Sequence, residues 1–148
     1  MLLYFAAPLF SPNELSFNAR LAGKIEGLGY DVFLPQRDGY EGTAATEGFE
    51  AWSEAIFERD KNAVLASDVL LCILDGRVPD EGMAVELGLG YADRIYHNAH
   101  RKLIGFSTDQ RIFSAAGINA MLAGALDEVH HDERSLLQRL QMLVDAAD

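Results

Sequence analysis

The sequence predicts an α/β fold, in which an open parallel sheet of about five strands is covered by helices on both faces. Several short apolar runs lack polar alternation, which is typical of strands buried on both sides. Helical patterns with capping residues separate these runs, so strands and helices alternate along the chain. The chain has 148 residues, of which 49% are hydrophobic, enough for one core in a single domain over residues 1–148.

The first elements have clear boundaries. A strand is expected over residues 2–7, where an apolar run ends at Pro8. Ser11 then begins a helix, because Pro at the first position and Glu at the third complete a capping pattern. A second strand is expected over residues 30–34. Residues 35–47 are expected to form a loop, and loops of this length in compact domains are often functional.

The rest of the chain continues the alternation. Helices are expected over residues 49–66 and 80–95, and an amphipathic terminal helix over residues 134–146. Strands are expected over residues 69–74 and 103–106, with a short fifth strand around Val129. The expected core residues of the first of these helices are Trp52, Ile56, Val64 and Leu65. This arrangement predicts a Rossmann-like or flavodoxin-like sheet, whose ligands bind beyond the carboxyl ends of the strands. The segments to search for a site are 7–10, 35–42, 75–86 and 107–119.

The charge balance limits the partners. Twelve Lys and Arg face 23 Asp and Glu, giving a net charge of −11. This argues against nucleic acid and against an anionic membrane surface, since both need clustered basic residues. No apolar run approaches the ~20 residues of a membrane span. Cys72 lies in an apolar run and is expected to be an inert buried thiol, and we expect a cytoplasmic protein that binds a neutral or weakly basic small molecule.

No metal or organic cofactor is expected. The histidines lack zinc-site spacing and are expected to lie in solvated loops; they are His97, His100, His130 and His131. Gly82, Gly88 and Gly90 are not spaced like a dinucleotide fingerprint and are better explained by close helix packing.

Three carboxylates are candidates for chemistry. Asp80 and Glu86 follow a buried strand and therefore lie at the expected ligand edge. Glu86 has apolar neighbours on its helix, where a carboxylate is costly unless it has a partner or a function. The alternatives are a helix cap for Asp80, a solvated helix face for Glu86 and a surface charge for Asp60.

The chain resembles the nucleoside 2-deoxyribosyltransferases up to about residue 122. The similarity is carried by five short segments in the same order at compatible spacing. They are residues 4–10, residues 34–39, Asp60 eight residues before Asp68, residues 80–88 and residues 118–121.

The resemblance implies a role for each site residue. Glu86 would be the nucleophile that attacks the anomeric carbon, Tyr4 would hold Glu86 in position, and Asp60 would lie near the base and help to protonate it. Gln36 would contact the base edge. Asp80, together with Asn119 of a neighbouring chain, would bind the sugar 5′-hydroxyl, which requires a homo-oligomer, either a dimer or a hexamer. The implied pocket lining is Phe10, Pro8 and Gly82.

The chemistry of the reaction fits these roles. Glycosyl transfer with retention needs one carboxylate as nucleophile and a second group that acts as acid and then base. The implied substrates are 2-deoxynucleosides and free purine or pyrimidine bases. Two other functions stay open: an N-glycosidase that hydrolyses 2-deoxynucleosides or 5′-monophosphates, and a non-catalytic nucleotide-sensing module. A phosphate dianion would be repelled by Asp80, which favours free nucleosides. Residues 123–148 fall outside the resemblance and are expected to form a further subunit contact.

Overall fold

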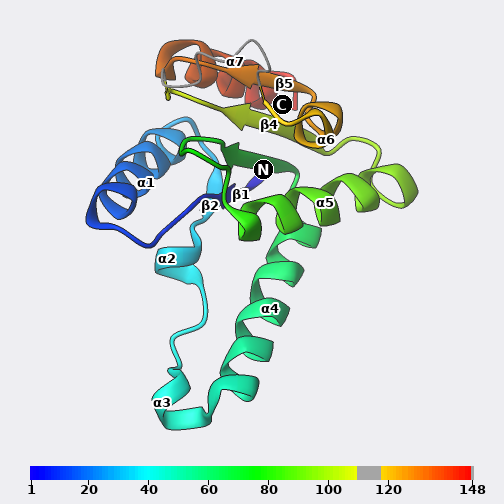
Figure 1. The fold of residues 1–148 in the computed structure, drawn as a ribbon. Coiled ribbons are helices and arrows are strands. Elements are labelled where there is room, and N and C mark those ends of the chain that lie inside the picture. The colour runs from blue at the N-terminus through cyan, green and yellow to red at the C-terminus, as the bar shows by residue number, and fades with distance from the viewer. Residues whose placement is uncertain (110–117, 148) are drawn as a thin grey trace.

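The computed structural model describes residues 1–109 and 118–147, so part of the segment 107–119 lies outside the described residues. Five parallel strands form one sheet in the order β2-β1-β3-β4-β5 (Figure 1). They are β1 (Leu2–Ala6), β2 (Asp31–Phe33), β3 (Val69–Ile73), β4 (Lys102–Phe106) and β5 (Glu128–His130). This is the flavodoxin-like order, with its switch point between β1 and β3, and the predicted fold class is confirmed.

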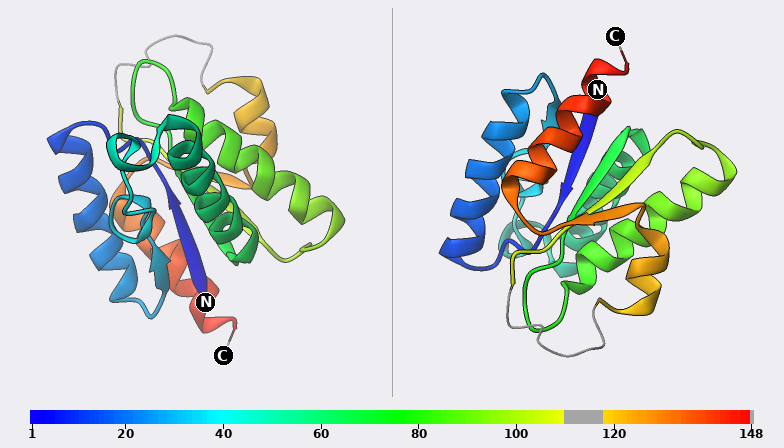
Figure 2. Two further views of the ribbon diagram at one scale, coloured as in Figure 1. Left: turned by 90° about the horizontal axis from the view of Figure 1, so that it is seen from below. Right: turned by 90° about the horizontal axis from the view of Figure 1, so that it is seen from above.

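Helices cover both faces of the sheet, as Figure 2 shows. On one face lie α1 (Pro12–Glu26) and α7 (Glu133–Asp145); on the other lie α4 (Phe49–Ala66), α5 (Glu81–Tyr96) and α6 (Ala120–Ala125). Alternate strand residues divide the core between the two faces. Leu3 and Phe5 point toward α1 and α7, whereas Tyr4 and Ala6 point toward α4 and α5.

The first helix begins where the sequence predicts. The side chains of Ser11 and Glu14 form the reciprocal capping box, with Pro12 in the first turn. The helix buries Leu21 and Ile25 together with one polar residue, Asn18, which is only 2% exposed. That buried amide lies close to the candidate site described below.

Some expectations were wrong. Residues 35–47 contain two short helices, α2 (Pro35–Asp38) and α3 (Ala44–Glu47), and α6 was not predicted at all. Leu65, expected in the core, is 39% exposed because it lies on the outer side of α4, next to the buried Val64. His130, expected in a solvated loop, is in β5 and partly buried.

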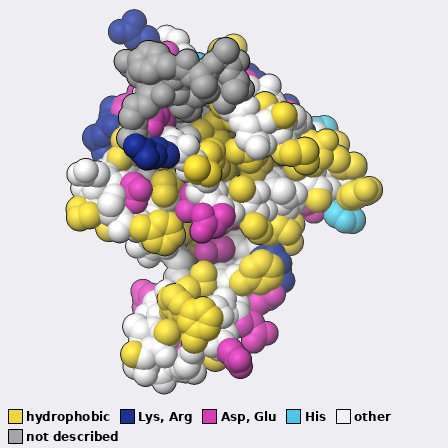
Figure 3. All heavy atoms as spheres, in the orientation of Figure 1, with side chains coloured by type: hydrophobic (Ala, Val, Ile, Leu, Met, Phe, Trp, Pro, Cys, Tyr) yellow, Lys and Arg dark blue, Asp and Glu magenta, His cyan; other side chains and the backbone are white. Residues whose placement is uncertain are grey.

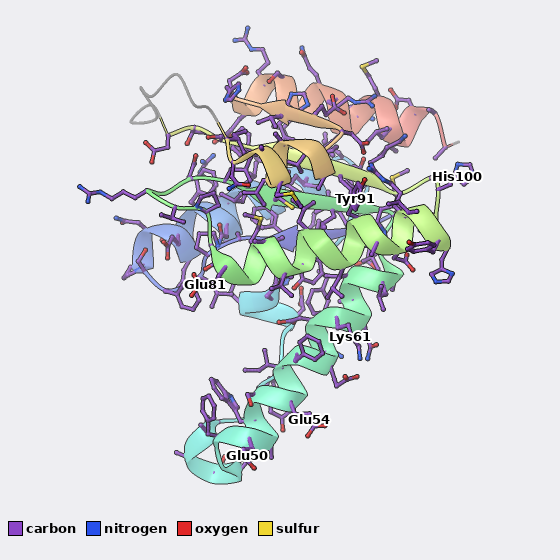
Figure 4. All side chains as sticks on the ribbon, turned by 45° about the vertical axis from the view of Figure 1, so that its right-hand side comes forward. Glu50, Glu54, Lys61, Glu81, Tyr91 and His100 are labelled. Carbon is purple, nitrogen blue, oxygen red and sulfur yellow. The ribbon has the colours of Figure 1, made fainter. Side chains whose placement is uncertain are left out.

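An arm projects from the body of the molecule. It consists of α3 and the N-terminal half of α4 (Figure 1). Figure 4 shows Glu50 and Glu54 on this arm and Lys61 nearer the body. The Trp52 indole donates a hydrogen bond of 3.0 Å to the Gly42 carbonyl, which ties the arm to the segment before it.

The C-terminal segment completes the fold. β5 pairs with β4, and Leu136 and Leu140 of α7 are fully buried against the sheet. Ala146 and Ala147 lie beside Met1, at the end of the sheet where β1 begins (Figure 2). These last described residues are therefore remote from the carboxyl ends of the strands. No helix in the described ranges has the length and apolar character needed to cross a membrane.

Candidate active site

Tyr4 and Glu86 form the centre of the candidate site. Tyr4 is fully buried in β1, and its side chain points toward the face that α5 covers. Glu86 lies in the second turn of α5. The Tyr4 hydroxyl donates a hydrogen bond of 2.5 Å to Oε1 of Glu86, across 82 residues of sequence. The contact holds one oxygen of the Glu86 carboxylate in place.

The surroundings of Glu86 favour its protonated form. Burial raises its pKa from 4.5 to about 7, and the negative charges of Asp60 and Asp80 add to the increase. The Tyr4 hydrogen bond acts in the opposite direction, because it stabilises the carboxylate. Glu86 is therefore not a fully solvated surface glutamate, and the charges of two nearby carboxylates disfavour its ionisation.

Asp60 is a second perturbed carboxylate. It lies on α4, and its Oδ1 is buried with no hydrogen-bond partner among the described residues. Burial raises its pKa to about 6, although the adjacent Arg59 lowers it. A buried polar atom without a partner is costly and calls for an explanation such as a catalytic role or a ligand. The surface-charge alternative for Asp60 does not describe this environment.

Asp80 caps α5. Its Oδ2 accepts a hydrogen bond of 2.9 Å from the Met83 backbone N–H, as the capping alternative predicted. The cap fixes the carboxylate near Glu86, whose pKa its charge raises. A Cβ on Gly82 would lie 3.0 Å from the same Oδ2, so glycine keeps the space beside this carboxylate open.

Two residues that the sequence did not single out support Tyr4. The ring of Phe33 stacks on the Tyr4 ring, with centroids 5.4 Å apart and planes 11° apart. The guanidinium of Arg59 lies 5.5 Å from the centroid of Phe33. Tyr4 and Phe33 are register partners in neighbouring strands, and that register has no local signal in the sequence.

The amide of Gln36 is bound to α1. Its Nε2 donates to the Leu15 carbonyl at 2.9 Å, and its Oε1 accepts from Nδ2 of Asn18 at 3.1 Å. The same Asn18 nitrogen donates to the Pro8 carbonyl at 2.9 Å. The sequence did carry a signal for Asn18, since it is a polar residue in the apolar face of α1.

Three other expected site residues, Phe10, Pro8 and Asn119, have different surroundings in the single chain. Phe10 is 79% exposed. Pro8 lines a hollow of about 260 Å³ between α1 and the turn after β3. Asn119 is exposed and caps α6, with its Oδ1 accepting from the Met121 N–H at 2.9 Å. It also lines an apolar hollow of about 780 Å³ between α5 and α6.

Figures 3 and 4 place these features on the molecule. Figure 3 shows Asp and Glu side chains gathered where the arm meets the body. In Figure 4, α5 crosses above α4, with Glu81 in its first turn and Tyr91 farther along; both line the larger hollow. Within residues 1–109 and 118–147, no three His, Cys, Asp or Glu side chains are grouped closely enough to hold a metal ion.

The family model for nucleoside 2-deoxyribosyltransferases matches residues 3–141. The chain belongs to this family. The family is one of enzymes that act on nucleosides, and its match extends through most of the segment that the sequence resemblance left out. Among curated proteins, no sequence matches significantly.

Solved structures show the same fold. A conserved protein from Enterococcus faecalis is 29% identical, with a TM-score of 0.79, and the alignment covers 95% of this chain and 97% of that one. A 2-deoxyribosyltransferase from Bacillus psychrosaccharolyticus is 23% identical, with a TM-score of 0.76 and coverage of 93% and 90%. A CMP N-glycosidase of Clostridium botulinum is 17% identical, with a TM-score of 0.55 and coverage of 95% and 98%.

Proposed function

We propose that the protein is a nucleoside 2-deoxyribosyltransferase that moves 2-deoxyribose between bases through a covalent glycosyl-Glu86 intermediate. The observation that carries the proposal is the hydrogen bond between buried Tyr4 and half-buried Glu86, beside a second carboxylate, Asp60, with an unpaired oxygen. Family membership supports the reaction class. The pair supplies a positioned nucleophile, and Asp60 supplies a group able to hold a proton near neutral pH.

The reaction consists of two displacements. In the first, the ionised Glu86 carboxylate forms a bond to the anomeric carbon while the bond from that carbon to the base nitrogen breaks, and the base leaves with a proton. In the second, the nitrogen of an incoming base attacks the same carbon, loses a proton and releases Glu86. Two inversions give overall retention. The oxocarbenium-like transition state is stabilised by the negative charges of this site.

Asp60 is the proposed carrier of the proton. With a pKa of about 6, it is close to the operating range of a neutral enzyme, as efficient general acid–base catalysis requires. It is protonated when it assists the leaving base and ionised when it accepts a proton from the incoming base. Its nearby negative charge also raises the pKa of Glu86.

The substrate is a 2-deoxynucleoside, and the second substrate is a free purine or pyrimidine base. Asp80 accepts a hydrogen bond from the sugar 5′-hydroxyl, while Gln36 contacts the base. Asn119 completes a neighbouring site in a homo-oligomer, a dimer or hexamer, which agrees with its exposed position on this chain. Phe10, Pro8 and Gly82 border the substrate.

The test is chromatography of a reaction that contains thymidine, free adenine and the purified protein. New deoxyadenosine together with thymine is the expected result. Thymine and deoxyribose without deoxyadenosine would instead identify a hydrolase. If thymidine is not consumed, deoxyinosine is supplied as the donor, and no turnover of either donor would overturn the proposal. A nucleotide hydrolase is disfavoured because Asp80 would repel a 5′-phosphate.

A further inference from the structure

We propose that Asn18 is a positioning residue, which fixes the orientation of the Gln36 amide and thereby selects the bases that the site accepts. The inference rests on the proposed transfer reaction and on the base-side role of Gln36. Asn18 itself contacts neither the sugar nor Glu86 in this proposal.

Asn18 is buried in a place that is unfavourable for an amide. It is 2% exposed and shares the buried face of α1 with Leu21, Ala22 and Ile25. A buried amide destabilises a protein unless its polar atoms form hydrogen bonds. Its Nδ2 forms two, at 2.9 Å to the Pro8 carbonyl and at 3.1 Å to Oε1 of Gln36. Asn18 therefore joins the segments that follow β1 and β2, both at the ligand edge of the sheet.

Two main-chain carbonyls determine the orientation of both amides. The Pro8 carbonyl can only accept, so Asn18 must present its nitrogen on that side. The Leu15 carbonyl can also only accept, so Gln36 must present Nε2 to it, at 2.9 Å. Oε1 of Gln36 then faces Asn18, whose nitrogen supplies the matching donor. The assignment is consistent, because Nδ2 of Asn18 meets two acceptors, while Oε1 and Nε2 of Gln36 meet a donor and an acceptor.

The fixed orientation limits what Gln36 can offer a ligand. One of its N–H groups and one lone pair of Oε1 are used by α1, so one donor and one acceptor are left in a fixed spatial order. Base edges differ in the order of their donors and acceptors. A side-chain amide that cannot rotate by 180° matches only one order of donor and acceptor on a base edge, whereas a freely rotating amide matches both orders. Asn18 thus holds the Gln36 amide in this one orientation together with the Leu15 carbonyl.

The test compares four proteins: the wild type, Asn18→Ala, Gln36→Ala and the double variant. Acceptor kcat and KM are measured with adenine, hypoxanthine, cytosine and thymine, using one deoxynucleoside donor. We expect Asn18→Ala to raise KM for the best acceptor by about tenfold, the effect of one lost hydrogen bond, and to narrow the ratios among the bases. KM should change more than kcat. In the Gln36→Ala background, Asn18→Ala should leave the acceptor ratios unchanged.

Two further variants keep the test decisive. Ser16→Ala lies on an exposed position of the same helix and should match the wild type. Asn18→Ser retains a small donor for the Pro8 carbonyl but is too short to hold Gln36 as well, so it should reproduce the loss of selectivity even if Asn18→Ala folds poorly. Circular dichroism checks the fold of each variant.

Two results would overturn the inference. One is unchanged acceptor ratios in both folded Asn18 variants; another is an equal effect of Asn18→Ala with and without Gln36, which would place its action on the Pro8 segment. These results differ from failure of the proposed function, in which the wild type itself would transfer deoxyribose to none of the bases.

Discussion

Replacing Glu86 by Gln should remove activity and make the folded protein more stable at alkaline pH. Gln is nearly the same shape and keeps an oxygen that accepts from the Tyr4 hydroxyl. It cannot ionise, however, so it avoids placing a charge beside Asp60 and Asp80. Sites that hold a destabilised functional group often gain stability when that group is neutralised.

The magnitude follows from the pKa of Glu86. Its value of about 7 in the folded protein, against 4.5 ordinarily, means that the folded state holds the proton more tightly than the unfolded state. The stabilising effect of this proton is complete below about pH 4.5 and is lost as pH rises through about 7. At ~1.4 kcal/mol per pH unit, the difference is about 3 kcal/mol above pH 8. Glu86→Gln should recover most of this, raising Tm by roughly 5–10 °C.

The assay is thermal unfolding at pH 5 and at pH 8.5. The stability difference between Glu86→Gln and the wild type should be small at pH 5 and large at pH 8.5. The matched control is Glu54→Gln, which removes a similar charge from an exposed position on α4 and should change stability by less than about 0.5 kcal/mol at either pH. A variant that is less stable than the wild type at pH 8.5, or a stability difference independent of pH, would show that burial of the ionised Glu86 does not destabilise the fold.

Three further predictions concern neighbouring groups. Tyr4→Phe removes the hydrogen bond that lowers the pKa of Glu86, so the acidic limb of the kcat/KM profile should move to higher pH; an unchanged limb would contradict this. Asp60→Asn removes a charge that raises the same pKa, so the acidic limb should move to lower pH while transfer from poor leaving groups slows most; a shift in the same direction as Tyr4→Phe would count against the coupling. Arg101→Ala should destabilise the fold by roughly 3–5 kcal/mol in urea unfolding, because it leaves Asp93, at 3.0 Å, and three main-chain carbonyls without their donor; a loss below about 1 kcal/mol would show that water replaces the guanidinium.

Most of the fold was predictable because its signals are local. The capping residues at Ser11 and the buried run of β3 depend only on adjacent positions, and the helix over residues 49–66 was predicted with its observed bounds. The segments α2 and α3 were missed because each is a single turn among Gly, Thr and Pro, where turn residues hide the helical pattern. Leu65 was misplaced because the tertiary packing of α4, not its composition, decides which face is buried.

The site was predictable only in part. That ligand-binding residues lie at the strand ends follows from the topology, and Asp80 and Glu86 were found there. The pairing of Tyr4 with Glu86 came from the family resemblance, since no local pattern links residues 82 positions apart. The stacking of Phe33 and the contacts of Asn18 depend on strand register and on the approach of three segments. No local sequence pattern predicts these two sets of contacts.

In the proposed reaction, Glu86 carries the 2-deoxyribosyl group. The most direct measurement is mass spectrometry of the protein after incubation with a 2-deoxynucleoside, acid quenching and proteolysis. We expect one added 2-deoxyribosyl group on the peptide that contains Glu86, absent from Glu86→Gln, and a transferred product of retained anomeric configuration. A label on a different residue, or an inverted product from an active enzyme, would contradict it.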